Sequence, residues 1–166
     1  MVSIDSDPAC TEYLYQSLKK EGQSGNLLPL TMNLANPSPG LGWDHRERAS
    51  WRDRGPADLV MALALIHHLV YSAHVPLPMV AEWMSRISRF ILVEFIPPSD
   101  PMVQKLCKSS TLPHPYSFEL FQDSFNRFSD FIDQAWLENE RHLFLGKKNT
   151  GGGKWAFLLC GKDIRK

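Results

Sequence analysis

The stretch Asp58–Tyr71 reads Asp-Leu-Val-Met-Ala-Leu-Ala-Leu-Ile-His-His-Leu-Val-Tyr. The residues that follow Asp58 form a continuous apolar run, whereas a strand with one face in water alternates apolar and polar residues. A continuous run indicates a strand that is covered on both faces, as in the parallel sheet of an α/β protein. We therefore expect this strand to lie inside an α/β sheet around which the other elements are arranged.

Two adjacent histidines, His67 and His68, follow the apolar run directly. In open α/β sheets, ligands bind outside the carboxyl ends of the strands, so both histidines lie where a site is expected. The imidazole of His68 can act as a general base, because its ordinary pKa near 6.5 lets it accept a proton at neutral pH. The alternative is that one histidine caps a short helix and the other packs in the core.

Composition limits the classes of protein. The 166 residues suit one domain, residues 1–166, and the 18 basic and 18 acidic side chains are scattered. A balanced and scattered distribution of charge does not indicate a nucleic-acid partner. The three cysteines are far apart and in no metal-binding spacing, which favours reduced thiols in a cytoplasmic protein. No apolar run reaches the roughly 20 residues of a membrane span, so we expect no membrane partner.

Upstream of the apolar run, the pattern predicts a strand, a helix and a second strand. Met1–Asp5 has strand character, and Asp7 with Pro8 is typical of a helix start that continues to about Lys20. Asn26–Leu34 carries the next apolar run. A strand, a helix and a strand in this order favour parallel pairing of the two strands.

Downstream, Arg89–Ile96 predicts another buried strand. Ser117 predicts a helix cap, and the helix after it carries phenylalanines that we expect on its core face: Phe118, Phe121, Phe125 and Phe128. Finally, His142–Leu145 and Trp155–Leu159 flank a glycine-rich segment. This arrangement predicts a C-terminal antiparallel hairpin.

The strand ends resemble those of a known family. Asp5 ends the first predicted strand, Asn33 ends the second, and His67-His68 ends the central one. Together with the strand near Phe90–Pro97 and the terminal hairpin, this order resembles class I S-adenosylmethionine-dependent methyltransferases, from their second strand to their last. The resemblance implies an α/β fold with a Rossmann-like, mostly parallel sheet, helices on both faces and a C-terminal antiparallel hairpin.

The resemblance also implies roles for residues at the strand ends. Asp5 corresponds to the acid that accepts hydrogen bonds from both ribose hydroxyls of S-adenosylmethionine, and Ser6 lies near the same ribose. A carboxylate suits two hydroxyl donors because it offers two acceptor oxygens. Asn33 takes the place of an acid that receives the adenine amino group, and Leu34 is an apolar neighbour of the ring.

After the central strand, the resemblance places Leu65, His67 and His68 beside the methionine part of the cofactor and the methyl acceptor. A base is not required by every methyl transfer, since alignment of the nucleophile, methyl group and sulfur supplies much of the rate.

The chain departs from the family in lacking the first strand and the Gly-rich loop after it. That strand is the middle of the sheet, so we expect an N-terminally truncated fold in which the flanks of Val2–Ile4 and Asp58–Ala64 are unpaired or pair with each other. Unpaired strand edges favour self-association. We also expect this chain to bind the cofactor weakly or not at all.

Three functions remain open. The first is methyl transfer to an unknown acceptor, small molecule or other, by the C-terminal major part of a longer enzyme. The second is a degenerate binding or assembly module without catalysis, which the missing loop and Asn33 favour. A metal-dependent hydrolase using His67, His68 and His74 is disfavoured, because adjacent helical residues point about 100° apart, so we expect no metal.

The long segment Asn36–Pro56 is rich in Pro, Gly, Arg and Trp and lacks apolar periodicity. One interpretation is a surface loop. The other is a lid for an anionic or planar substrate, formed by aromatic and cationic side chains: Trp43, Arg46, Arg48, Trp51 and Arg52.

Overall fold

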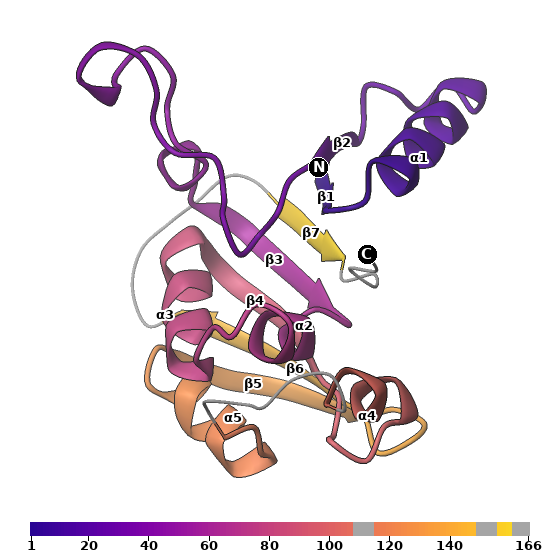
Figure 1. Ribbon diagram of the computed structural model, residues 1–166, viewed down its shortest axis with the longest axis vertical. Helices are drawn as coiled ribbons and strands as arrows, with labels where there is room; N and C mark the ends of the chain where they lie inside the picture. The colour runs from indigo at the N-terminus through magenta and orange to yellow at the C-terminus, as the bar shows by residue number, and fades with distance from the viewer. Residues whose placement is uncertain (108–114, 149–155, 161–166) are drawn as a thin grey trace.

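The computed structural model of the protein describes residues 1–107, 115–148 and 156–160. Its strands are β1 (Val2–Asp5), β2 (Leu28–Thr31), β3 (Ala57–Leu63), β4 (Ser88–Phe95), β5 (Ser129–Trp136), β6 (His142–Lys148) and β7 (Ala156–Cys160). Its helices are α1 (Pro8–Lys20), α2 (Ile66–Tyr71), α3 (Leu77–Ile87), α4 (Pro101–Cys107) and α5 (Phe118–Asn126), with 3-10 turns η1 (Trp43–His45) and η2 (Arg52–Arg54). The strands form one sheet in the spatial order β2–β1–β7–β3–β4–β6–β5 (Figure 1).

The apolar run after Asp58 forms β3, a strand inside the sheet with parallel neighbours, β4 and β7, on its two edges. Val60 and Ala62 are fully buried on one face. Met61 on the other face is only half-buried, so the predicted covering of both faces is complete on one face alone. The predicted Rossmann-like α/β fold with a mostly parallel sheet is confirmed.

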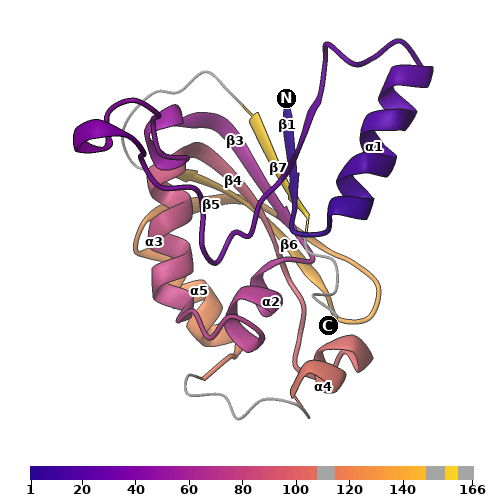
Figure 2. The same ribbon diagram turned by 45° about the horizontal axis from the view of Figure 1, so that its top comes forward.

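Helices lie on both faces of this sheet. Figure 2 shows α2, α3 and α5 on one side and α1 on the other, beside β1. Within the described ranges, no helix combines the length and the apolar character that crossing a bilayer requires.

The predicted helix starts are confirmed. The Asp7 carboxylate accepts the backbone N–H of Ala9 at 2.8 Å, and Pro8 opens α1, which ends at Lys20. The Ser117 hydroxyl accepts the N–H of Leu120 at 3.2 Å and caps α5 in the same way. Each cap satisfies an N–H that has no partner inside its own helix.

The aromatic face of α5 is core, as predicted. Phe121 and Phe125 are fully buried, and Phe118 and Phe128 pack half-buried against the same cluster. Phe144 of β6 joins them, with its ring centroid 5.5 Å from that of Phe121. This cluster fastens α5 to the antiparallel part of the sheet.

The predicted hairpin between His142–Leu145 and Trp155–Leu159 is wrong in one of its strands. β6 pairs antiparallel with β5 and β4, so the antiparallel hairpin is β5–β6. β7 instead pairs parallel with β1 and β3, and Trp155 lies outside the described residues. The error has a physical reason: a short apolar run has the same local pattern whether it pairs with its sequence neighbour or with strands far along the chain.

The expected gap in the middle of the sheet is also wrong. β7 occupies that position, with Phe157 in register with Val2 on one side and Val60 on the other. The inner edges of β1 and β3 are therefore paired, although not with each other. The unpaired edges on which we based self-association are absent there, and self-association itself stays an untested prediction.

Proline in place of Leu159 tests the central position of β7. This residue pairs with Ile4 and with Ala62, so loss of its backbone N–H leaves a buried acceptor unpaired at about 1–3 kcal/mol. We expect the melting temperature to fall by at least about 5 °C, measured by circular dichroism. The control, Ile132→Pro, changes a bulged position of the edge strand β5 and should shift it by less than about 2 °C. Equal shifts in the two variants would contradict the strand order.

Candidate functional site

Five parallel strands bring their carboxyl ends to one edge of the sheet. From β1 the chain crosses through α1 to β2 on one side, whereas from β3 it crosses through α2 and α3 to β4 on the other side. The direction of winding therefore reverses between β1 and β3, where β7 is inserted. In open α/β sheets this reversal forms the crevice in which ligands bind.

Asp5 lies at the carboxyl end of β1 and is 7% exposed. Its Oδ1 accepts the backbone N–H of Asp7 at 2.9 Å, which orients the carboxylate in the turn that leads into α1. Among the described residues, its other oxygen has no hydrogen-bond donor. Ser6 is half-buried in the same turn. An oriented carboxylate with an acceptor oxygen to spare fits a ligand that presents hydroxyl groups.

Asn33 follows β2, the strand next to β1, and its side chain is exposed. The side-chain Oδ1 accepts the N–H of Ala35 at 2.9 Å within the same loop. Leu34 is half-buried and packs against the core. Because Thr31 lies in register with Asp5, the Asn33 and Asp5 side chains belong to the same corner of the sheet.

Leu65 follows β3 and is buried, and His67 and His68 lie in the short helix α2. The two imidazole rings are in contact, with centroids 4.2 Å apart and planes tilted by 40°. β3 is two strand spacings, or about 10 Å, from β1. The structure thus places Leu65 across β7 from Asp5, and it places both histidines in a buried helix rather than in a loop.

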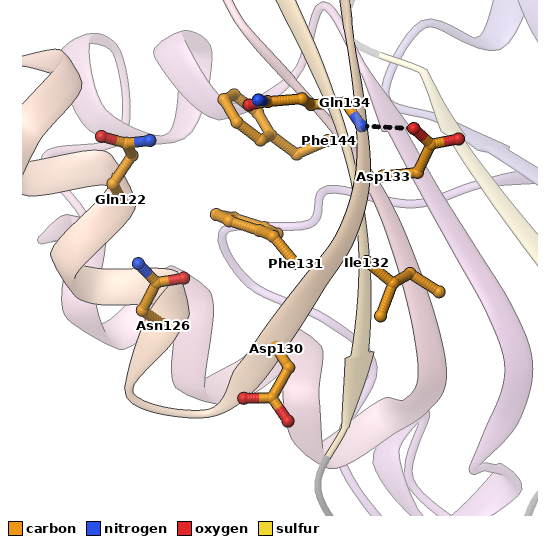
Figure 3. Close-up of a pocket in the computed structure, with 8 residues that line it drawn as sticks. All are labelled: Gln122, Asn126, Asp130, Phe131, Ile132, Asp133, Gln134 and Phe144. Atoms are coloured by element: carbon orange, nitrogen blue, oxygen red, sulfur yellow. Dashed lines mark hydrogen bonds between the residues drawn. The ribbon is translucent and has the colours of Figure 1, made fainter.

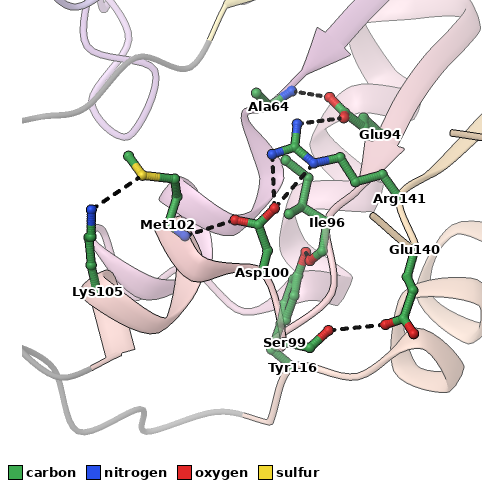
Figure 4. Close-up of polar contacts among 10 residues, drawn as sticks. All are labelled: Ala64, Glu94, Ile96, Ser99, Asp100, Met102, Lys105, Tyr116, Glu140 and Arg141. Carbon is green, nitrogen blue, oxygen red and sulfur yellow. Dashed lines mark hydrogen bonds and ion pairs between the residues drawn. The ribbon is translucent and has the colours of Figure 1, made fainter. Parts of the chain in front are cut away.

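A strained turn joins β3 to α2. Ala64 has a φ of 51°, a left-handed conformation that costs a residue with a Cβ about 1 kcal/mol. Its backbone N–H donates to Oε2 of Glu94 at 2.7 Å, so the neighbouring strand β4 supports the turn (Figure 4). Glu94 is therefore a positioning residue for the segment that carries Leu65 and the histidines.

Glu94 belongs to a buried ionic cluster with Arg141 and Asp100, which Figure 4 shows converging at this edge. Arg141, in the turn between β5 and β6, donates from Nη1 to Glu94 at 3.4 Å and from Nη2 to Asp100 at 2.9 Å. The Asp100 carboxylate also accepts the N–H of Met102 at 2.8 Å, at the start of α4. The cluster joins the hairpin, β4 and α4.

The charges in this cluster are tuned by their surroundings. Burial opposes ionisation of Asp100, but hydrogen bonds from Arg141 and Met102 and the charge of Arg141 outweigh it and lower the pKa of that carboxyl. Nearby, Tyr116 donates to the Ile96 carbonyl at 3.0 Å, and burial strongly raises its pKa. Tyr116 is therefore a neutral donor that fixes the loop after β4.

The arginine- and tryptophan-rich segment divides into two parts. Trp43 is 86% exposed and Arg46 pairs with Asp44 at the tip of the loop, away from the sheet. Nearer the sheet, a pocket of about 330 Å³ lies between the loop and β2. It has apolar and cationic lining: Leu28, Leu30, Met32, Arg48, Trp51 and Arg54. The structure thus brings two predicted lid residues, Arg48 and Trp51, to a pocket and leaves the others apart.

A second pocket, of about 590 Å³, lies at the opposite end of the sheet between α5 and β5 (Figure 3). Gln122 and Asn126 project from the helix toward Phe131 and Gln134 of the strand, with Asp130 at the rim. β5 is the edge strand furthest from β1, so this pocket does not belong to the site around Asp5.

Within the described ranges, no group of three His, Cys, Asp or Glu side chains is arranged to hold a metal ion. His74 is exposed, outside the buried helix that carries His67 and His68. The structure does not bring the three histidines together as a metal site.

Sequence reasoning missed Glu94 and Arg141. A signal for Glu94 existed, since it is a carboxylate inside the apolar run Arg89–Ile96 near the carboxyl end of its strand. Arg141 had no signal, because it lies in a polar turn and is 47 residues from Glu94 in sequence.

Comparison with known proteins gives one sequence relative and several structural neighbours. The chain is 31% identical over 150 residues to the nodulation protein NoeA of Rhizobium meliloti (strain 1021). The match covers 90% of this chain but 30% of NoeA, so the chain spans less than a third of that relative. No protein family model matches the chain.

Solved structures with low sequence identity share the fold. A possible exported protein from Bordetella parapertussis superposes with a TM-score of 0.58 at 11% identity, over 90% of this chain and 53% of its own. The protein PH0226 from Pyrococcus horikoshii OT3 gives 0.59 at 10% identity, over 90% and 71%. Monomeric WbdD gives 0.55 at 14% identity, over 88% and 30%. These likenesses support the Rossmann-like fold.

Arg141→Ala tests the ionic cluster. The substitution leaves two buried carboxylates without their cation, and breaking a buried ion pair costs about 3–5 kcal/mol. Because the Arg141 side chain is 31% exposed, we expect the lower part of that range, about 3 kcal/mol, in urea unfolding at pH 7. Arg86→Ala, which breaks an exposed pair with Glu82, is the control and should cost less than about 0.5 kcal/mol.

The difference in stability between the wild type and Arg141→Ala should depend on pH. The folded-state pKa of Asp100 is lowered from 3.8, so its contribution is present above that pH and is lost as the pH falls through the lowered value. The stabilities of the wild type and Arg141→Ala should therefore converge as the pH falls below 3.8 and through the lowered pKa of Asp100. A difference that stays constant as the pH falls below 3.8 would contradict the assignment.

His142→Phe tests a buried neutral histidine. Burial lowers the pKa of His142 below 6.5, and its ring packs 4.9 Å from that of Phe118. The unfolded chain therefore takes up the proton first, and the wild type loses stability as the pH falls below about 6.5. We expect His142→Phe to lose less stability than the wild type between pH 7.5 and pH 5.5 in urea unfolding. His74→Gln, at an exposed site, should follow the wild type; if all three respond equally, His142 is not the group that titrates.

Proposed function

We propose that this chain binds S-adenosylmethionine and forms part of an enzyme that transfers its methyl group to an acceptor. The observation that carries the proposal is the Asp5 carboxylate at the point where the winding reverses, oriented by Asp7 and with an oxygen to spare. The fold of the structural neighbours and the similarity to NoeA are consistent with it. The proposal includes a cytoplasmic location, because the three cysteines of the sequence are far apart and in no metal-binding spacing, which favours reduced thiols.

In this proposal, Asp5 accepts the ribose hydroxyls, Ser6 lies beside the ribose, and Asn33 with Leu34 borders the adenine. The second lone pair of the Asn33 carbonyl is available for an amino donor, because one lone pair already accepts the N–H of Ala35. Charge-assisted hydrogen bonds of the Asp5 kind contribute about 1.5–3 kcal/mol each. Bound S-adenosylmethionine supplies an activated methyl group.

Leu65, His67 and His68 take the acceptor side of the site. The Ala64 turn, supported by Glu94, sets the position of this segment relative to Asp5. His68 is assigned as the base that removes a proton from the acceptor, with His67 in ring contact to hold its orientation. Exclusion of water by the buried helix α2 would strengthen such a proton transfer.

The pocket near β2 gives the proposal an acceptor class. Arg48 and Arg54 line this pocket together with apolar side chains that include Leu30 and Trp51. A pocket lined by two cations and by apolar side chains suits an anionic molecule with a planar or apolar body.

The second candidate function is a binding or assembly module without catalysis. It is favoured by Asn33, which stands where an acid is expected and whose Oδ1 is engaged within its own loop. Such a module would hold the fold without needing Asp5 for any ligand.

Calorimetric titration of S-adenosylmethionine into the chain separates the two functions. Because the Gly-rich loop is missing, we expect weak binding, and the proposed function requires that this binding be measurable. Asp5→Ala should weaken it at least about tenfold, from the loss of one charge-assisted interaction. Asp130→Ala, at an exposed carboxylate on the far edge strand, should leave it unchanged.

Asp5→Asn is the matched variant, since its carbonyl can still accept the Asp7 N–H while the charge is lost. If Asp5→Asn keeps the wild-type melting temperature and also binds at least about tenfold more weakly, the carboxylate itself holds the ligand. No binding by the wild type, or binding that neither Asp5 variant alters, would favour the non-catalytic module.

A further inference from the structure

Three adjacent strands share a regular alternation of burial. In β3, β4 and β6, every second side chain is fully or almost fully buried, as with Val60, Ile91 and Phe144. Most of the side chains between them are half-buried and apolar. The exceptions on this face are the small buried residues Ala57 and Ser88, the buried carboxylate Glu94 near the carboxyl end of β4, and the exposed Lys147 at the end of β6. These half-buried side chains form what we call the open face: Leu59, Met61, Leu63, Phe90, Leu92, Leu143 and Leu145.

Strand register makes the open face continuous. Leu59 lies beside Phe90, and Met61 lies beside Leu92, which in turn lies beside Leu145. Side chains in register on neighbouring strands are about 5 Å apart, close enough to form one surface. In an antiparallel sheet such a face would carry polar residues, whereas this apolar composition is typical of a sheet that is covered on both sides.

The described helices leave this face uncovered. α2, α3 and α5 lie on the opposite side of the sheet, as Figure 2 shows. α1 does lie on the side of the open face, because Thr11 contacts Thr31 at 2.6 Å between hydroxyl oxygens, and Thr31 shares a face with Asp5 and Met61 through the register. However, α1 packs mainly on β1 and β2.

Among the described elements, no other helix lies beside α1 on this side of the sheet (Figure 2). Thr11 is its one buried residue, while Leu14 and Leu18 stay half-buried and Tyr13 is 79% exposed. Beyond it, β7, β3, β4 and β6 are together about 19 Å wide. That is the width of two helices of about 10 Å each. The layer that α1 begins therefore has room for two more helices.

We propose that the open face is a docking surface for amphipathic α-helices that lie beside α1 and are supplied by polypeptide outside residues 1–166. NoeA supports this source, because most of that relative lies outside the part that this chain matches. The structural neighbours likewise contain chain beyond the shared fold. The recognised feature is an apolar helical stripe with polar residues on its far side. The proposal concerns assembly and does not depend on cofactor binding.

A synthetic peptide of 18 residues tests the proposal. Its leucines recur every three or four residues to form one stripe, with Lys and Glu elsewhere, and a control peptide of equal composition spreads its leucines around the helix. Fluorescence anisotropy of each labelled peptide is measured against the 166-residue chain. We expect saturable binding of the striped peptide, at least tenfold tighter than that of the control peptide. Absent binding, or equal binding of the two peptides, would overturn the proposal.

Variants locate the binding. Leu92→Gln, at the centre of the open face, should weaken binding of the striped peptide at least tenfold. Leu145→Gln on the next strand gives the same test if Leu92→Gln fails to fold by circular dichroism. Leu28→Gln changes a leucine that is 54% exposed on the other face of β2 and should leave binding unchanged.

Sedimentation equilibrium tests whether the open face is instead covered by a second copy of the chain. A monomer that binds the striped peptide supports the proposal. A dimer that Leu92→Gln dissociates would show that the open face pairs with itself, and the proposal for helices from other polypeptide would be rejected.

Discussion

The structure depends on the parallel pairing of β7 with β1 on one side and β3 on the other. β1, β2 and α1 form one small unit, and β3 to β6 with their helices form another. β7 is the strand through which the sheet joins them, because hydrogen bonds along both of its edges convert two incomplete sheets into one. It also sets the separation between Asp5 and the Ala64 turn, the two sides of the candidate site.

Around that site, hydrogen bonding and ionic contacts play different parts. Asp5 is oriented by a single backbone N–H, which leaves capacity for a ligand. Arg141 instead pairs with both Glu94 and Asp100, so this cluster stabilises the fold and is not available to a ligand. Through Glu94 the cluster reaches the Ala64 N–H, so the hairpin and the segment before the histidines are mechanically connected. A buried carboxylate at a strand end can therefore either bind a ligand or stabilise the fold. The partners that it already has within the protein indicate which of these two roles it plays.

The sheet is asymmetric in how its faces are covered. One face is closed by α2, α3, α5 and an aromatic cluster centred on Phe121. The other has apolar side chains in continuous register but only α1, at one end, among the described helices. Parallel strands bury apolar residues on both faces because their crossovers are helical, and the half-buried leucines are the observation on which the proposed docking of further helices rests.

The sequence by itself determined the individual elements: the strand after Asp58, the capped starts of α1 and α5, and the polar residue at the end of β1. These follow from local rules, since a cap or an apolar run depends on residues a few positions apart. Only the tertiary structure decided which strands pair. The pattern of Ala156–Cys160 suits a hairpin or a central strand equally, and Arg141 finds Glu94 across 47 residues. Pairing and ionic contacts of this kind depend on the packing of the whole chain, which no local pattern encodes.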